Sequence, residues 1–365
     1  MNAREESLLD AIVKNSSSPW MDGSGDLADV VISSRVRLAR NLTDVPFPHL
    51  MEERQAREVL DRAFAAVKAI SAKAAKGAFA ELGAIDLEDI SPLDRQVLVE
   101  KHLMSPQHAQ PGFGKGLITR PDEKVSIMVN EEDHVRLQCL YSGLELDEAW
   151  ITASGIDDLL DERLDFAYDD RRGFLTACPT NAGTGLRASV MIHLPALALG
   201  DEVSRVLAAV NKLGLVVRGL FGEGTEGQGN VFQVSNQITL GQTEKEIIEN
   251  LSLVAKQVVA EEKRFRDTLI KTQRSGLEDR IFRAWGILSN ARSMSSQEAV
   301  KLWSDVRLGV ELGMMPGVDV RRANEILVIA QPSFVQRTTG KAMPPEERDT
   351  RRADLIRQHL LPSRA

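Results

Sequence analysis

Cysteine and aromatic residues are scarce in this chain, and no segment stays strongly apolar over a long run. Only two cysteines, Cys139 and Cys178, occur among 365 residues, and Phe, Trp and Tyr together make up 5% of them. Two cysteines provide neither a disulfide framework nor the spacing of a zinc site, which predicts a reducing cytoplasmic location. No apolar run approaches the roughly 18 residues that span a bilayer, and the N-terminus lacks the basic-then-apolar pattern of a secretory signal. We therefore expect no membrane contact.

Positive charge is also in deficit, because 45 Lys and Arg residues stand against 53 Asp and Glu residues. The formal net charge of −8 argues against nucleic-acid binding over the whole surface, although it leaves room for a local basic site. With 43% apolar and 27% charged residues, the composition is typical of a soluble globular protein. A chain of this length accommodates two domains.

The chain divides into three parts by its periodicity. Residues 1–28 contain a short amphipathic helix and a Ser- and Gly-rich run, and we expect a loosely attached lead-in. Residues 29–265 alternate β-branched runs with helical stretches, without the tight periods of a parallel sheet, which favours an α+β domain. Residues 266–365 show only helical periods and predict an all-helical C-terminal domain. A capping box, Thr243-Glu-Lys-Glu246, begins a long helix before that boundary.

The familiar nucleotide-binding motifs are missing or out of context. Gly222, Gly224 and Gly227 match the pattern G-x-G-x-x-G, but a β-branched run follows them where the dinucleotide motif needs a helix. The pattern G-x-x-x-x-G-K-[S/T] is absent, and so are the V-A-I-K, H-R-D and D-F-G segments of protein kinases. Any nucleotide must therefore be held in another way.

Arginines offer that other way. Five of them stand at the ends of predicted strands, beside a turn or a polar cluster: Arg35, Arg37, Arg136, Arg187 and Arg218. Planar guanidinium groups are suited to clamp a triphosphate, which carries about four negative charges. Arg35 and Arg37 should share one face of a strand, because side chains alternate. A solvated surface position is the simpler interpretation of each arginine taken alone, whereas five such placements together favour a shared role.

Carboxylates and a cysteine accompany the arginines. The run Glu131-Glu-Asp-His134 follows an apolar strand directly, Glu223 lies in a glycine-rich loop, and Cys178 precedes a Pro-Thr-Asn turn. Phosphate-binding arginines together with carboxylates suggest phosphoryl transfer to a cationic acceptor. A guanidinium fits, because it is a poor nucleophile until a carboxylate orients it and takes its proton. A solvated acidic face and a buried inert thiol are the simpler interpretations of the same residues.

Four groups of residues, in this order, resemble the phosphagen (guanidino) kinase family. They are Ser33-Ser-Arg-Val-Arg37, Asn130-Glu-Glu-Asp-His134, Cys178-Pro-Thr-Asn181 with Gly185-Leu-Arg-Ala-Ser-Val190, and Val217-Arg-Gly-x-x-Gly-Glu223. The resemblance covers residues 29–265. It implies an antiparallel sheet flanked by helices, Mg-ATP as phosphoryl donor, and phosphorylation of a guanidino nitrogen.

The resemblance also implies roles for individual positions. ATP would contact Ser33, Ser34, Arg35, Val36, Arg37, His102, Arg136, Arg187, Ala188, Ser189, Val190, Met191, Arg218, Gly219, Leu220, Phe221, Gly222 and Glu223. Glu132 and Glu223 would align and deprotonate the acceptor, with Glu131 as a neighbour and Cys178 in contact with the acceptor. Mg2+ would be held mainly through the ATP phosphates, without a metal site made by the protein.

Within this family, the closer resemblance is to the bacterial protein-arginine kinases, over nearly the whole chain. Glu100-Lys-His-Leu103, Ser235-Asn-Gln-Ile-Thr-Leu-Gly241 and Asp305-Val-Arg-Leu-Gly309 carry it. A segment near the C-terminus is similar to an R-D-x-x-R-A phosphoarginine-binding motif, which would use Arg348, Asp349, Arg352 and Ala353. The implied partners are proteins that carry arginine, an activator protein, a Clp unfoldase–protease and a second copy in a homodimer. The implied setting is the stress response and protein quality control.

Two departures from the family pattern concern the acceptor. Phosphagen kinases that act on small free substrates carry a helical N-terminal domain whose loop closes over the substrate, whereas fewer than 30 residues precede Asp29 here. They also carry an additional arginine where Leu220 and Phe221 stand. Both changes favour an open site that admits an arginine within a polypeptide. A kinase of a free guanidino metabolite and a non-catalytic phosphoarginine-binding module remain as alternatives.

Overall fold

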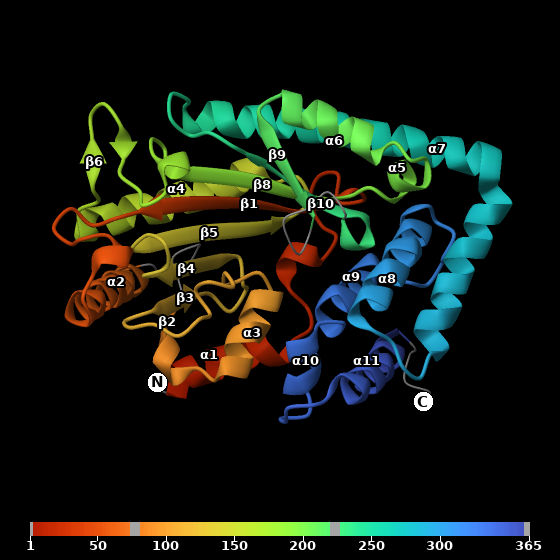
Figure 1. Ribbon diagram of the computed structural model, residues 1–365, viewed down its shortest axis with the longest axis horizontal. Coiled ribbons are helices and arrows are strands. Elements are labelled where there is room, and N and C mark those ends of the chain that lie inside the picture. The colour runs from red at the N-terminus through yellow and green to blue at the C-terminus, as the bar shows by residue number, and fades with distance from the viewer. Residues whose placement is uncertain (1–2, 74–80, 220–226, 361–365) are drawn as a thin grey trace.

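The computed structural model describes residues 3–73, 81–219 and 227–360, and Figure 1 shows its arrangement. At its centre is an eight-stranded sheet with the order β2-β3-β4-β5-β1-β8-β10-β9, in which all neighbouring strands are antiparallel. Its strands are β1 (Val31–Arg40), β2 (Gly83–Asp86), β3 (Gly116–Thr119), β4 (Val125–Val129), β5 (Val135–Ser142), β8 (Leu186–His193), β9 (Leu215–Gly219) and β10 (Val231–Asn236). A separate hairpin consists of β6 (Tyr168–Asp169) and β7 (Gly173–Phe174). The predicted α+β class with an antiparallel sheet is confirmed.

Strand β1 lies in the middle of the sheet and shows why the two faces differ. Val36 and Leu38 are fully buried in the main hydrophobic core, whereas Arg35 and Arg37 alternate with them on the opposite face. The same division extends to the neighbouring strands, because directly opposed residues lie on the same face of a sheet. One face is therefore apolar, and the other carries polar side chains.

Helices cover the apolar face. The helix α4 (Leu146–Leu164) packs along β1 and β5, α2 (Glu53–Lys73) contacts β4, and α6 (Val203–Lys212), which follows the short α5 (Pro195–Leu199), packs on β9. The first part of α7 (Glu244–Asn290) completes this layer over β8 and β10. Each helix buries an aliphatic stripe against the sheet, and the main core lies between the two layers.

The C-terminal part is helical, as predicted. It contains the second part of α7, α8 (Ser296–Glu311), α9 (Val320–Ile329), α10 (Pro332–Arg337) and α11 (Pro345–Leu360). A second hydrophobic core joins these helices to α1 (Ala3–Lys14) and α3 (Pro92–Glu100), and Trp303 is fully buried in it. Figure 1 shows these blue helices beside one end of the sheet. None of the helices described is both long and apolar enough to cross a membrane.

The N-terminal segment is held more tightly than its composition predicts. Ile12 and Trp20 are buried in the second core, so the expectation of a loosely attached lead-in is wrong. The buried Nζ of Lys101 donates to the carbonyls of Ile12 and Asn15 at 2.8 and 3.0 Å, and Glu123 balances its charge. A serine-rich sequence gives no sign of these contacts, because they depend on residues far along the chain.

One helix carries the chain across the predicted domain boundary at residue 266. Helix α7 begins with the predicted capping box, in which Thr243 and Glu246 each bind the other's backbone N–H, and it runs for 47 residues. Its helical geometry is interrupted at Gln273, where φ is −139° and ψ is 27°. The break in the helix therefore lies seven residues after the predicted boundary, and residue 266 itself is in regular helix.

Candidate active site

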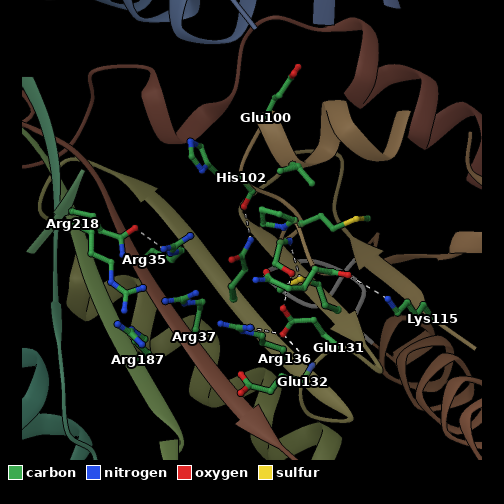
Figure 2. A pocket seen from close by; sticks show the side chains of 18 of the residues that line it. Arg35, Arg37, Glu100, His102, Lys115, Glu131, Glu132, Arg136, Arg187 and Arg218 are labelled. Atoms are coloured by element: carbon green, nitrogen blue, oxygen red, sulfur yellow. Dashed lines mark hydrogen bonds and ion pairs between the residues drawn. The ribbon is translucent and has the colours of Figure 1, made fainter. Parts of the chain in front are cut away.

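The polar face of the sheet gathers the five arginines that the sequence singles out. Arg136 lies on β5, Arg35 and Arg37 on β1, Arg187 on β8 and Arg218 on β9. Arg37 is directly opposite Arg187 in the β1–β8 pair, and the register of the other pairs places the remaining arginines on the same face. Figure 2 shows these side chains lying around one common space. The convergence that phosphate binding requires is present.

A cavity of about 950 Å³ lies over this face. Besides the arginines, its lining includes Glu131 and Glu132 before β5, His102 after α3, and Lys115 before β3. Gln331, just before α10, also lines it, so the C-terminal helices contribute to its wall. Cavities of about 300–1,000 Å³ are the usual size for small-molecule sites, and this one is large enough for a nucleotide.

The arginines are crowded together and short of carboxylate partners. Burial, followed by the charges of Arg136 and Arg187, lowers the pKa of Arg35 to about 10, and burial followed by Arg35 lowers the pKa of Arg37. Arg35 donates to a neutral partner, Gln233 Oε1, at 2.8 Å. The Nε atoms of Arg37 and Arg187 are buried without a hydrogen-bond partner among the described residues. Concentrated positive charge with unpaired donors fits a polyphosphate such as that of ATP.

The two adjacent glutamates differ in their surroundings. The Glu131 side chain is buried, pairs with Arg136 and accepts a hydrogen bond from Ser105. Burial alone would raise the pKa of Glu131, but Arg136 and Ser105 outweigh that effect and leave the pKa below its ordinary value. Glu132 is exposed, forms no ion pair within the described part of the chain, and has a pKa raised by burial and by Asp133. Glu131 therefore fixes Arg136, whereas Glu132 is available to a cation.

The remainder of this acidic run has a structural role. Asp133 is buried and accepts hydrogen bonds from Asn41 Nδ2 at 2.6 Å and from the backbone N–H of Ala177 at 2.7 Å. Both ring nitrogens of His134 bind backbone atoms of the segment that follows β1. Burial lowers the pKa of His134 to about 4, so the ring is uncharged at pH 7. Asp133 and His134 therefore bind the surrounding fold, and Glu131 and Glu132 are the residues of this run that line the cavity.

Cys178 lies directly before the 3-10 turn η4 (Pro179–Asn181), which leads toward β8. Its thiol is partly exposed, unlike that of the buried Cys139. Burial and neighbouring arginines lower the pKa of Arg187, and the charges of Cys178 and Glu132 oppose that shift. Cys178 and Glu132 therefore each lie within electrostatic reach of Arg187.

Comparison with known proteins identifies the family. The family model of ATP:guanido phosphotransferase, C-terminal catalytic domain, matches residues 59–265, and that of the Protein-arginine kinase McsB C-terminal domain matches residues 274–365. A protein-arginine kinase of Moorella thermoacetica is 54% identical over 94% of this chain and 97% of its own length. One of Symbiobacterium thermophilum is 52% identical over 96% of this chain and 98% of its own length.

The chain belongs to the protein-arginine kinase family. It is therefore a phosphotransferase, and the resemblance found in its motifs is confirmed. Two solved structures share the fold. Lombricine kinase matches with a TM-score of 0.57 over 72% of this chain and 78% of its own, at 22% identity. The duplicated taurocyamine kinase from Schistosoma mansoni matches with a TM-score of 0.57 over 71% of this chain and 38% of its own, at 24% identity.

Four of the predicted ATP-binding positions turn their side chains away from the cavity. Ser34, Val36, Ala188 and Val190 are buried on the apolar side of the sheet, and Ser34 donates to the carbonyl of Gly143. Strand alternation requires this orientation, because each of these residues is next in sequence to one that faces the cavity. The structure therefore assigns these four side chains to the buried side of the sheet, and contact between ATP and the backbone of these residues stays a prediction.

His102 lies beside the arginine cluster, where the prediction places a residue near the nucleotide. Its ring packs edge-on against Trp20, with 5.2 Å between the ring centroids. Burial and the charge of Arg35 lower its pKa to about 4, so the ring is uncharged at pH 7. His102 and Trp20 line a small recess next to the main cavity, and three more of the predicted residues line it as well: Ser33, Ser189 and Met191.

The loop after β9 holds the remaining predicted positions. Gly219, the last residue of β9, lines the cavity. Leu220, Phe221, Gly222 and Glu223 lie outside the described residues. The role of Glu223 as the second acceptor-binding carboxylate therefore stays a prediction.

The predicted phosphoarginine-binding residues, Arg348, Asp349, Arg352 and Ala353, all lie on α11. Arg352 is buried, donates to the carbonyls of Ala330 at 2.6 Å and Met294 at 2.8 Å, and pairs with Asp349. It therefore ties α11 to the end of α9 and to the segment before α8. Arg348 differs, because its Nε is buried without a partner in the described part of the chain. Arg348 is thus better suited than Arg352 to meet an added anion.

Three polar residues that complete the cavity are not predicted by the sequence motifs. Gln233 on β10 binds Arg35, and Gln138 on β5 donates to the backbone carbonyl of His102 at 2.7 Å. Lys115 lines the cavity from the loop before β3. Gln233 could have been found from the sequence, because it is a polar residue between Phe232 and Val234. In a strand, such a residue points to the face away from the core.

Proposed function

We propose that this chain transfers the γ-phosphoryl group of ATP to a guanidino nitrogen of arginine residues in proteins. The observation that carries the proposal is the row of five arginines on one sheet face, with Glu132 beside it as a carboxylate that has no ion-pair partner among the described residues. The arginines favour a polyphosphate and the carboxylate favours a cation. The family to which the chain belongs supports the same reaction.

The arginines would hold the ATP phosphates and stabilise the charge of the transition state. Arg37 and Arg187 carry buried donors that are unpaired within the described ranges of the chain, and Arg136 is fixed by Glu131, so their charges are already in place before the nucleotide binds. Preorganised positive charge in a sheltered cavity stabilises the transferring phosphoryl group without further rearrangement. Mg2+, bound through phosphate oxygens, would supply additional neutralisation of charge. The uncharged His102 would lie near the nucleotide.

Glu132 would orient the acceptor guanidinium and take the proton that leaves as the N–P bond forms. A guanidinium has a pKa above about 12, so it becomes a nucleophile only when a base accepts its proton. The raised pKa of Glu132 makes its carboxylate a better base than an ordinary glutamate. Glu223 would provide the second carboxylate, and Cys178 would contact the acceptor from the side of η4.

Phosphoarginine in a protein is the product that tests this proposal. The enzyme, incubated with Mg-ATP and an unfolded basic protein, should produce it, and mass spectrometry under non-acidic conditions should detect it, because the N–P bond is acid-labile. Free arginine, assayed in parallel with labelled ATP, should be a poor acceptor. Phosphorylation of free arginine alone would favour a metabolite kinase. Binding of phosphoarginine without ATP turnover, lost in Arg348→Ala, would favour a non-catalytic binding module.

The cellular role that we propose follows from the family resemblance. In the cytoplasm, phosphoarginine would mark damaged proteins for a Clp-type unfoldase–protease during stress, with an activator protein controlling the kinase and the kinase itself forming a homodimer. Reconstituted degradation of a phosphorylated substrate tests the first part. Rates with and without the activator, and sedimentation equilibrium of the kinase, test the others.

A further inference from the structure

A second cavity opens directly beside the first. It encloses about 560 Å³ between the N-terminal end of α2, the turn η2 (Pro48–Leu50) and the loop before β3. Lys115, Glu131 and Glu132 line both cavities, so the two spaces meet at the carboxylate proposed to bind the acceptor. The reaction proposed for the first cavity leaves the second without an assigned ligand.

Asn130 lines this second cavity, and its side chain carries a hydrogen-bond acceptor that is unpaired among the described residues. It is only 4% exposed and is part of the lining. Its Nδ2 donates to the carbonyls of Ala56 on α2 and Gly114 in the loop, at 2.8 and 2.7 Å. These two acceptors fix the orientation of the amide, and its Oδ1 remains buried with no partner in the described residues. A buried acceptor without a donor is unfavourable, so an N–H group of a ligand would stabilise it.

The loop before β3 holds an apolar side chain at this cavity. Gly114 has a φ of +56°, and a Cβ at this position would lie 2.6 Å from the backbone carbon of Ala56, so only glycine allows the loop to approach α2 this closely. The adjacent residue Phe113 lines the cavity and is 61% exposed. Met51 and Ala177 add further apolar surface. Together they can cover an apolar side chain of a ligand.

The second cavity is also negatively charged. Its four carboxylates are Glu52, Glu53, Glu131 and Glu132. Glu52 and Glu53 are exposed and have no ion-pair partner within the described part of the chain. The ammonium of Lys115 is occupied by backbone carbonyls, including that of Gln110 at 2.9 Å. A basic or neutral ligand therefore fits this cavity, and an acidic one is repelled.

We propose that the second cavity receives the polypeptide that flanks the target arginine. An apolar side chain next to the arginine packs against Phe113 and Met51, and a backbone N–H of the substrate donates to Asn130 Oδ1. Glu52 and Glu53 repel acidic flanking residues. This inference rests on the proposed function and deepens it, because it assigns the substrate class as apolar or basic segments of unfolded proteins. A small guanidino compound would leave these contacts unmade.

Peptides that contain a single arginine test the proposal with the full-length enzyme. The residue on either side of the arginine is glycine, leucine or aspartate, and kcat/KM is obtained from phosphoarginine measured at neutral pH. Leucine should raise kcat/KM about tenfold over glycine on one side, as expected for one added apolar contact. Aspartate should lower kcat/KM by a comparable factor because of repulsion.

Two variants assign these preferences to the cavity. Phe113→Ser should remove the preference for leucine, and the double variant Glu52→Gln, Glu53→Gln should remove the discrimination against aspartate. Each result is a ratio between two peptides in one variant, so a general loss of activity cancels. The controls are Phe282→Ser, a similarly exposed phenylalanine on α7, and Glu58→Gln, an exposed glutamate on α2. Both controls should keep the wild-type ratios.

Methylation of the substrate backbone tests the hydrogen bond to Asn130. Peptides are N-methylated at the amide before or after the arginine, which removes one donor at a time. One of the two should lose about tenfold in kcat/KM, the usual effect of leaving a buried acceptor unpaired. Unchanged kcat/KM for both peptides would contradict this contact.

Failure of the inference and failure of the proposed function give different results. If the wild-type enzyme phosphorylates all flanking sequences with equal kcat/KM, or if both cavity variants keep the wild-type ratios, the inference is overturned and arginine phosphorylation stands. If no phosphoarginine forms on any peptide or protein, the proposed function is overturned and the inference with it.

Discussion

Strand β1 contains two kinds of arginine, one on each face of the sheet. Arg40, on the apolar face, is 2% exposed, and its guanidinium pairs with Asp157 of α4 at 2.7 Å and lies 3.5 Å from the ring centroid of Phe174. It also donates to two backbone carbonyls. Arg37, on the other face, has a buried Nε without a hydrogen-bond partner among the described residues, and three arginines surround it.

The contrast separates arginines that stabilise the fold from arginines that bind a ligand. A buried cation whose partners are all protein atoms has no capacity left for an added anion. A cation that lies among other cations destabilises the folded state until an anion binds, so its presence requires a functional explanation. An arginine on the apolar face of this sheet therefore stabilises the fold, whereas an arginine on the polar face is available to a ligand, although both lie on the same strand.

Replacing Glu132 should have the largest effect on the reaction. In Glu132→Gln, kcat should fall about 10²- to 10⁴-fold, because an amide cannot accept the proton of the guanidinium. The free energy of unfolding should stay unchanged, since this side chain is exposed and forms no ion pair in the described residues. Rates of phosphoarginine formation and urea unfolding measure both quantities, with Glu148→Gln on α4 as the control. A wild-type rate in Glu132→Gln would remove this residue from the chemistry.

Replacing Arg40 should have the largest effect on stability. In Arg40→Met, the free energy of unfolding should fall by about 3–5 kcal/mol, because Asp157 is left buried without its partner. The double variant Arg40→Met, Asp157→Leu should regain most of that loss, since it removes both charges. Urea unfolding of the two variants measures the difference. A loss below about 1 kcal/mol in the single variant would mean that the pair behaves as an exposed one.

The pH dependence of the reaction should show a smaller effect. Burial and the neighbouring Asp133 raise the pKa of Glu132 above its ordinary value of 4.5. The carboxylate must be ionised to accept a proton, so activity should fall as the pH decreases through this raised pKa. With saturating Mg-ATP, the midpoint of the acid limb of kcat/KM for the acceptor should lie above pH 4.5. Glu132→Asp should shift that midpoint, and an unshifted midpoint would assign the limb to another group.

Patterns that depend on neighbouring residues could be predicted from the sequence. Strand alternation alone places Arg35 and Arg37 on one face, and the Thr243 capping box locates the start of α7. The motif resemblance gave the antiparallel fold and the arginines that meet in the cavity. Each of these predictions needs only residues a few positions apart or a known order of motifs.

Features that depend on distant contacts could not be predicted. The sequence does not show that Glu131 pairs with Arg136, whereas the adjacent Glu132 has no ion-pair partner in the part of the chain that the structure describes. The burial of the N-terminal segment depends on Lys101, and the second cavity depends on a loop that packs on α2. In each case the deciding partner lies many positions away in the chain, and local preference carries no information about it.

Thermal unfolding of wild type and Arg37→Met, each with and without saturating Mg-ATP, tests the central claim most directly. Without nucleotide, Arg37→Met should be at least as stable as wild type, because it removes a cation crowded by like charges. With Mg-ATP, the unfolding midpoint of the wild type should rise, and that of the variant should rise much less. The loss of one charge-assisted hydrogen bond weakens binding about 10- to 100-fold. A variant that is destabilised without nucleotide and keeps the full rise with Mg-ATP would contradict the account, because Arg37 would then be a structural residue like Arg40.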